Sequence, residues 1–136
     1  MRIILDTNCL IMSLSRRSAY YPVWSALRQG KYDLCITNEI IEEYEEILSQ
    51  KMSKDIATNV INAILDFPNV HKTEIFFHFG LIQEDYDDNK FVDCAVAADA
   101  ECIVTNDSHF SILKQIEWPK LTVISIKEFT MQLGLI

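Results

Sequence analysis

Several apolar runs in this chain are too short to form helices, and they alternate with longer segments that read as helices. The first run is RIIL at residues 2–5, and others lie at 34–36, 102–105 and 121–125, with a further candidate strand and turn within 69–82. Short strands that are apolar throughout are typical of a parallel sheet covered by helices on both faces. We therefore predict a three-layer α/β/α fold in which strands and helices alternate.

The segments between these strands are expected to be helical. The expected helices cover residues 8–14, 20–29, 39–50, 54–66, 88–100, 108–115 and 127–133. A chain of 136 residues with 49% apolar side chains has the size of one domain that buries its own core. We therefore expect a single domain over residues 1–136.

Composition also indicates the cellular setting. No run approaches the roughly 18–20 apolar residues of a membrane span, and Asp6 interrupts the first apolar run, which argues against a signal peptide. The four cysteines, Cys9, Cys35, Cys94 and Cys102, form no C-x-x-C pair, so we expect buried, reduced thiols and no structural zinc site. These features predict a cytoplasmic protein.

The formal net charge of −8 argues at first sight against nucleic acid as a partner, because phosphate binding usually needs surplus lysine and arginine. The charge is unevenly distributed, however. Residues 1–31 carry five bases and one acid, whereas 39–46 carry five acids and no base, and 84–107 carry eight acids and one base. Solvated helix faces explain most acidic runs, so the placement of these acids has to decide their role.

Acidic residues follow two of the predicted strands. Asp6 comes directly after the first strand, and Asp107 follows the strand at 102–105, with Asn106 between them. In parallel α/β sheets, sites lie outside the carboxyl ends of the strands. The chain has neither a G-x-G-x-x-G nor a P-loop motif, so a glycine-rich nucleotide site is not expected. Taken alone, each aspartate is also compatible with capping the element that follows it.

Helical geometry selects two further acids. Glu43 lies at the boundary of the apolar stripe of its helix and can point past the core. Asp88 falls within the stripe of its helix, at the helix start, whereas Asp93 falls on the opposite face. A surface role for Glu43 and a purely capping role for Asp88 stay open, and Asp87 and Asp93 remain alternatives to Asp88.

Four carboxylates can therefore converge at one edge of the sheet: Asp6, Glu43, Asp88 and Asp107. Partly buried like charges a few ångströms apart repel strongly unless a cation lies between them. Oxygen ligands without histidine or cysteine favour Mg²⁺ or Mn²⁺ over zinc. Lys90 is the lysine that adjoins these acids in the sequence, but helical geometry places it off the apolar stripe. We predict a divalent-cation site, which suits phosphoryl chemistry.

These residues, in this order, resemble the PIN domain family. The resemblance rests on D-T-N after the first strand, I-I-E-E-Y, D-D-N-K-F and V-T-N-D, and it extends over essentially the whole chain to the closing I-K-E-F. It is closest to the subgroup described as toxin components of toxin–antitoxin systems. It implies a PIN-like fold with a central five-stranded parallel sheet, a Mg²⁺- or Mn²⁺-dependent ribonuclease, and, in the subgroup, a homodimer and a small antitoxin partner.

The resemblance also implies roles for individual residues. The acidic positions of the family are matched by Asp6, Glu43, Asp88 and Asp107. Asp6 and Asp107 are then expected to bind the metal directly, and Asp88 to bind the metal or a metal-bound water. Glu43 is expected to orient the water that attacks the phosphorus, and the reaction leaves a 5′-phosphate and a 3′-hydroxyl. Asn8 and Thr105 match positions that support the site by hydrogen bonding, and Asn106 stands where this subgroup has a glycine.

Basic and aromatic residues follow the first site loop. Arg16 and Arg17 precede Tyr20, Tyr21 and Trp24. Such interleaving suits single-stranded RNA, through phosphate contacts and base stacking, although solvated arginines and core aromatics give the same pattern. A metal site and this local arginine pair, rather than the overall charge, would then hold an RNA substrate.

Two other functions fit parts of the pattern. A Rossmann-like metal-dependent phosphatase usually has a second aspartate two residues after the first, but this chain has Asn8 there. A catalytically silent PIN-like module that binds RNA or protein is the other alternative, and the four intact acids argue against it. The histidines His71, His78 and His109 are expected to be ordinary structural or surface residues, although His109 is near enough to Asp107 to reach a substrate.

Overall fold

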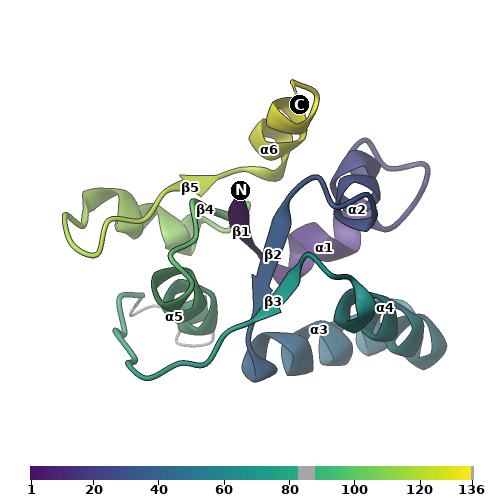
Figure 1. The fold of residues 1–136 in the computed structure, drawn as a ribbon, viewed down its shortest axis with the longest axis horizontal. Helices are drawn as coiled ribbons and strands as arrows, with labels where there is room; N and C mark the ends of the chain where they lie inside the picture. The colour runs from purple at the N-terminus through teal and green to yellow at the C-terminus, as the bar shows by residue number, and fades with distance from the viewer. Residues whose placement is uncertain (83–87, 136) are drawn as a thin grey trace.

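The computed structural model describes residues 1–82 and 88–135, and its centre is a five-stranded sheet (Figure 1). The strands are β1 (Arg2–Leu5), β2 (Asp33–Ile36), β3 (Val70–Lys72), β4 (Cys102–Val104) and β5 (Val123–Ile124). They pair in the order β3-β2-β1-β4-β5, and every pairing is parallel. The predicted parallel α/β fold is confirmed.

Helices connect the strands as the sequence predicts. They are α1 (Thr7–Ser13), α2 (Tyr21–Arg28), α3 (Asn38–Lys51), α4 (Lys54–Asp66), α5 (Asn89–Ala97) and α6 (Ile126–Leu133). The short helix expected near 108–115 is a 3-10 helix, η2 (Ser108–Gln115). The strand expected within 69–82 is only three residues long, and the chain continues from it without regular structure to residue 82.

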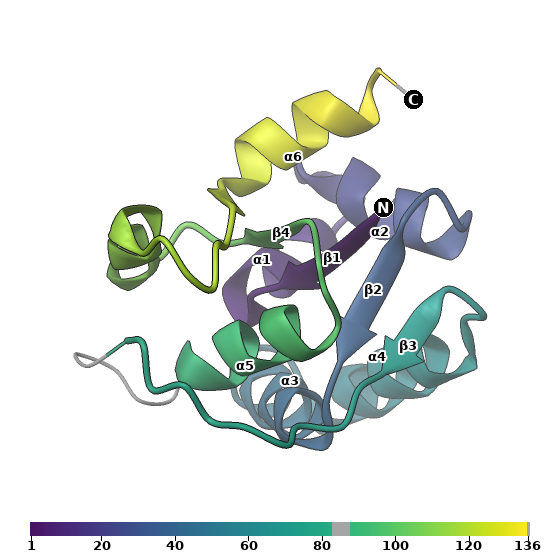
Figure 2. The same cartoon turned by 60° about the vertical axis from the view of Figure 1, so that its left-hand side comes forward.

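The two faces of the sheet carry different helices. Figures 1 and 2 show α5 on one side of the sheet and α1, α3 and α4 on the other. The chain steps from β1 through β2 to β3 in one direction, and from β3 back to β4 and β5 in the other. With right-handed crossovers, such a reversal puts the connecting helices on opposite faces. The switch between the two directions lies between β1 and β4, where α/β proteins form their sites.

Local sequence sets where several helices begin. The Thr37 hydroxyl accepts a hydrogen bond from the Ile40 amide at 3.2 Å and starts α3, as the sequence predicts. The Ser53 hydroxyl does the same for α4. Ser125 and Glu128 form a capping box at the start of α6. The caps of α3 and α6 fix the first turns of helices that leave the carboxyl edge of the sheet, and the cap of α4 starts the helix that follows α3.

The core lies on both faces of the central strands. Ile3, Ile4 and Leu5 in β1 are fully buried, as the apolar run predicts. Tyr44 in α3 is also fully buried, and its hydroxyl donates a hydrogen bond to the Leu5 carbonyl oxygen. This bond ties α3 to the end of β1, and it places Glu43 beside the residue that follows the strand.

Two expectations from composition can be compared with the structure. All four cysteines are buried, and burial raises the pKa of the Cys9 and Cys94 thiols to about 12. Such thiols stay protonated near neutral pH and act as small apolar groups. Within residues 1–82 and 88–135, no helix is long and apolar enough to cross a membrane.

Candidate active site

The structure brings the four predicted acids to one cavity at the carboxyl edge of the sheet. Asp6 follows β1, Glu43 lies on α3, Asp88 precedes α5, and Asp107 follows β4. All four line a cavity of about 260 Å³. The other lining residues are Thr7, Asn8, Ile47 and Lys51. Residues far apart in the chain thus meet at the switch point between β1 and β4.

Asp6 is the most deeply placed of these acids. It is only 6% exposed, and the Thr105 hydroxyl donates a hydrogen bond to its Oδ2 at 2.7 Å. Burial raises the pKa of Asp6; the Thr105 hydrogen bond opposes this rise, and the nearby charges of Glu43 and Asp107 add to it. The Thr105 hydroxyl also accepts from the Asp107 amide at 3.0 Å, so one side chain positions both aspartates.

Glu43 is held through both of its carboxylate oxygens. The Thr7 hydroxyl donates to Oε2, and the Lys90 ammonium lies 2.9 Å from Oε1. Helical geometry placed Lys90 off the apolar stripe of α5 and did not indicate which group it contacts. In the structure α3 and α5 approach each other, and Lys90 reaches across to Glu43. A carboxylate held in this way keeps one orientation in the cavity wall.

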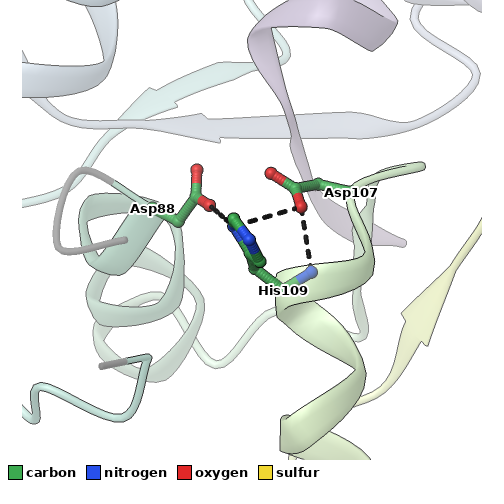
Figure 3. Close-up of side chains that lie close together, drawn as sticks. All are labelled: Asp88, Asp107 and His109. Atoms are coloured by element: carbon green, nitrogen blue, oxygen red, sulfur yellow. Dashed lines mark hydrogen bonds and ion pairs between the residues drawn. The ribbon is translucent and has the colours of Figure 1, made fainter. Parts of the chain in front are cut away.

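Asp88, Asp107 and His109 form the tightest group of possible metal ligands among the described residues. One potential ligand atom from each lies within 4.8 Å of the others. Figure 3 shows the His109 imidazole between the two carboxylates, with Nδ1 3.6 Å from Asp88 Oδ2 and 3.4 Å from Asp107 Oδ1. No histidine was expected in the metal set, but His109 lies close enough to Asp88 and Asp107 to hold a metal with them.

The capping alternatives can now be compared with the geometry. Asp107 does cap η2, since its Oδ1 accepts from the His109 amide at 2.9 Å. This bond involves the backbone of His109, whose ring lies between Asp88 and Asp107 (Figure 3). Asp88 stands at the cap position of α5, but its side chain makes no capping hydrogen bond. A purely capping role therefore does not explain Asp88.

Of the two alternatives to Asp88, Asp87 lies outside the described residues, and Asp93 can be compared with the structure. Asp93 was expected on the face of its helix away from the core, but it is buried. Its carboxylate lies 3.1 Å from His78 Nδ1 and accepts from the Phe79 amide at 3.0 Å. The expectation failed because the irregular segment after β3 covers that face of α5, and Asp93 anchors this segment instead of lining the cavity.

The remaining predicted site residues have distinct surroundings. The Asn8 amide oxygen accepts from the Lys51 ammonium at 3.0 Å, inside the cavity wall. The Asn106 side chain accepts from the Ile126 amide at 3.2 Å and so ties the loop before Asp107 to the start of α6. Lys51 was not predicted, because nothing in the local sequence shows that the end of α3 returns to β1.

Arg16 and Arg17 are exposed in the turn after α1, at the opposite end of that helix from Asp6. The aromatics that follow them are partly packed. Trp24 contacts the Phe67 ring, with centroids 5.8 Å apart, and Tyr20 packs against the core. The arginines therefore do not line the acidic cavity. Any contact that they make with a substrate lies away from the acids.

The chemistry of this donor set fits a divalent cation. Several carboxylates gather in one cavity, and the most buried of them, Asp6, has a raised pKa because ionisation there is costly. The buried Nδ1 atom of His109 faces two carboxylates and makes no hydrogen bond with the described residues. A cation among these groups would offset the repulsion between the carboxylates. Asp88, Asp107 and His109, with Asp6 beside them, are the residues that can hold it.

The fold and this cavity together define an α/β protein with a carboxylate site at the switch point of its sheet. A family model described as a PIN domain matches residues 2–109. The chain therefore belongs to the PIN domain family, and the fold expected from the sequence resemblance is confirmed.

Solved structures share this fold at low sequence identity. VapBC-1 from nontypeable Haemophilus influenzae matches with a TM-score of 0.64 and 16% identity, over 93% of this chain and 99% of the other. VapBC2 from Rickettsia felis, bound to a DNA fragment from its promoter, has a TM-score of 0.63 and 18% identity, over 92% and 98%. VapC20 from Mycobacterium tuberculosis, described as a sarcin–ricin loop cleaving toxin, has a TM-score of 0.57 and 14% identity, over 80% and 92%. No curated protein matches the chain.

Proposed function

We propose that this chain is a divalent-metal-dependent endoribonuclease that hydrolyses RNA phosphodiester bonds at the acidic cavity. The observation that carries the proposal is the meeting of four acids from separate elements in one cavity of a PIN domain. Carboxylate-rich sites of this kind suit Mg²⁺ or Mn²⁺. The reaction leaves a 5′-phosphate and a 3′-hydroxyl, as the family resemblance implies.

The aspartates would hold the cation, and the other side chains position the reactants. Asp6, Asp88 and Asp107 are the proposed ligands, with His109 beside them. When bound, the cation polarises the phosphate and lowers the pKa of water. Glu43, held by Thr7 and Lys90, accepts a hydrogen bond from the attacking water and orients it towards the phosphorus.

Partners form a second part of the proposal. The VapBC structures that share this fold support a role as the toxin of a toxin–antitoxin pair, with a small antitoxin protein as partner. The family resemblance further implies a homodimer. The VapC20 toxin, described as cleaving the sarcin–ricin loop, supports RNA as the substrate. Arg16 and Arg17 then contact backbone phosphates away from the cavity.

A cleavage assay on tRNA and mRNA pools tests the proposal, with Mg²⁺, Mn²⁺ or chelator and with the product ends mapped. We expect cleavage only with metal, and we expect Asp6→Asn to abolish it while the circular dichroism spectrum stays unchanged. Glu45→Gln, at an exposed position of α3, is a matched control that also removes one negative charge and should cleave normally. Full activity of Asp6→Asn would contradict the proposal.

One observation favours a second candidate, a silent PIN-like module that binds RNA or protein. Lys90 pairs with Glu43, so the charge of one of the four acids is balanced without a metal. Calorimetry with Mg²⁺ and Mn²⁺ separates the two candidates. Metal binding that is lost in Asp6→Asn supports the nuclease, and metal binding that does not depend on the acids supports the silent module.

A further inference from the structure

Lys51, the last residue of α3, brings a positive charge into the wall of the acidic cavity. Its ammonium donates a hydrogen bond to the Asn8 amide oxygen at 3.0 Å, across 43 positions of the sequence. Both residues line the same cavity as the four acids. Among the described residues that line this cavity, Lys51 is the one that carries a positive charge.

Lys51 differs from Lys90 in the charge of its partner. Lys90 lies 2.9 Å from a Glu43 carboxylate oxygen, and both side chains are at most 20% exposed, so that pair is an ion pair within the protein. Lys51 is exposed, and the amide oxygen that it contacts is neutral. The Asn8 bond therefore positions the ammonium without neutralising it. An ammonium has three N–H donors, and Asn8 accepts from one.

A structural role explains only part of this arrangement. A lysine at the carboxyl end of a helix interacts favourably with the helix dipole, and this interaction does not require the lysine side chain to point in any particular direction. The contact with Asn8 adds a specific direction, because it brings the ammonium to the residue two positions after Asp6. An anion that approaches the cavity meets repulsion from its four carboxylates, and Lys51 offers an attractive contact at the same place.

We propose that Lys51 binds a phosphate group of the RNA backbone at the cavity, next to the bond that is cleaved, and that Asn8 holds its ammonium in position. The inference rests on the proposed function and names a substrate-binding residue for it. It also assigns the phosphate contact nearest the acids to the end of α3, whereas the arginine pair at Arg16 and Arg17 lies at the far end of α1.

Three variants test the inference. Lys51→Met removes the charge and keeps most of the side-chain length, Lys51→Arg keeps the charge, and Lys31→Met is a matched control. Lys31 is exposed and precedes β2, at the opposite edge of the sheet from the cavity. In Mg²⁺, with a single-stranded oligoribonucleotide, we expect Lys51→Met to raise KM about tenfold and to change kcat less than about twofold, because one charge-assisted phosphate contact is lost.

Salt dependence adds a readout that a merely structural role would not change. The slope of log(kcat/KM) against log[KCl] should become shallower by roughly 0.7 in Lys51→Met, as expected for one fewer phosphate contact on a single strand. Lys51→Arg and Lys31→Met should keep the wild-type slope. Asn8→Ala should raise KM by a smaller factor, about threefold, because the ammonium remains but is less well positioned.

Binding can be measured apart from catalysis in an Asp6→Asn background. The probe is a fluorescein-labelled oligoribonucleotide followed by anisotropy, and Lys51→Met should weaken its binding about tenfold relative to Lys31→Met in the same background. If the wild type cleaves no RNA, the proposed function fails. If the wild type cleaves RNA and Lys51→Met equals Lys31→Met in KM, salt slope and binding, the inference about Lys51 is overturned. Thermal melting checks that the variants are folded. If Lys51→Met does not fold, Lys51→Gln takes its place in the same measurements.

Discussion

The two sides of the acidic cavity are built differently. On one side, Asp6 and Glu43 are held by hydroxyl groups and a lysine of the fold, through Thr105, Thr7 and Lys90. On the other side, His109 lies 3.4 and 3.6 Å from the carboxylate oxygens of Asp107 and Asp88, beyond the usual hydrogen-bond range of roughly 2.7–3.2 Å. Asp107 is also partly exposed, whereas Asp6 is buried.

This difference suggests that the two sides have different roles: the Asp6–Glu43 side positions the reactants, and the Asp107 side binds the metal. Good hydrogen bonds hold the first side in one arrangement before any ligand arrives, which reduces the cost of ordering it later. The second side brings three possible ligand atoms within 4.8 Å of one another, and the His109 ring lies beyond the usual hydrogen-bond range of both carboxylates. We therefore expect the loss of metal binding to concentrate on the Asp107 side, and the loss of water orientation to concentrate at Glu43.

The largest effects on activity are expected for Asp107→Asn and Glu43→Gln, which change the two different sides of the cavity. Both should lower kcat for RNA cleavage by about 10²–10³-fold, because each removes a group that acts on charge developing in the transition state. Their metal affinities should differ: Asp107→Asn should weaken Mn²⁺ binding at least about tenfold, and Glu43→Gln less than about threefold. Isothermal titration calorimetry with Mn²⁺ measures this. Equal losses in both variants would remove the distinction between the two sides.

His109→Ala should have an intermediate effect that depends on the metal. Imidazole nitrogen binds later transition metals better than it binds Mg²⁺. If His109 is a ligand, the variant should lose about tenfold in Co²⁺ affinity and only about twofold in Mg²⁺ affinity. Calorimetry with both ions checks the prediction, and His71→Ala, at an exposed histidine on β3, is the control. A similar loss for both ions would show that His109 does not ligate through nitrogen.

Asp6→Asn should stabilise the metal-free protein at neutral pH. Burial raises the pKa of Asp6, so the folded state loses stability as the pH rises through that pKa, and the cost is present at pH 7. The variant should therefore melt a few degrees above the wild type at pH 7 in chelator. Near pH 4 and below, the carboxyl becomes protonated in both states and the difference should disappear. Thermal unfolding at several pH values measures the difference in melting temperature between the variant and the wild type, with Glu45→Gln as the control. A melting temperature of Asp6→Asn below that of the wild type at pH 7 would contradict the prediction.

The smallest expected effect is that of the double substitution Arg16→Ala/Arg17→Ala. These residues are exposed and lie at the far end of α1 from Asp6, so a contact with RNA there adds affinity without touching the reacting atoms. KM should rise about two- to threefold with kcat unchanged. Steady-state kinetics at low salt shows the effect most clearly. A large fall in kcat would place the arginines at the cavity instead.

Much of the fold could be predicted because its signals are local. Short apolar runs become buried strands, as Ile3 to Leu5 show, and Thr37 caps the helix that it was expected to cap. Asp6 and Asp107 follow strand ends, so parallel strands bring them to one edge. Asp93 shows the limit of this reasoning, because helical geometry described α5 alone, and a segment from elsewhere in the chain buries its other face.

The amino-acid sequence by itself determined the order of strands and helices and the four acids that meet at the edge of the sheet, since periodicity and strand-end position are properties of neighbouring residues. Only the tertiary structure decided which lysines and which histidine lie beside those acids. Lys51 meets Asn8, Lys90 meets Glu43, and His109 meets Asp88, each across a contact between elements. Such contacts depend on how helices cross the sheet, and side chains as long as lysine reach partners that sequence spacing does not indicate.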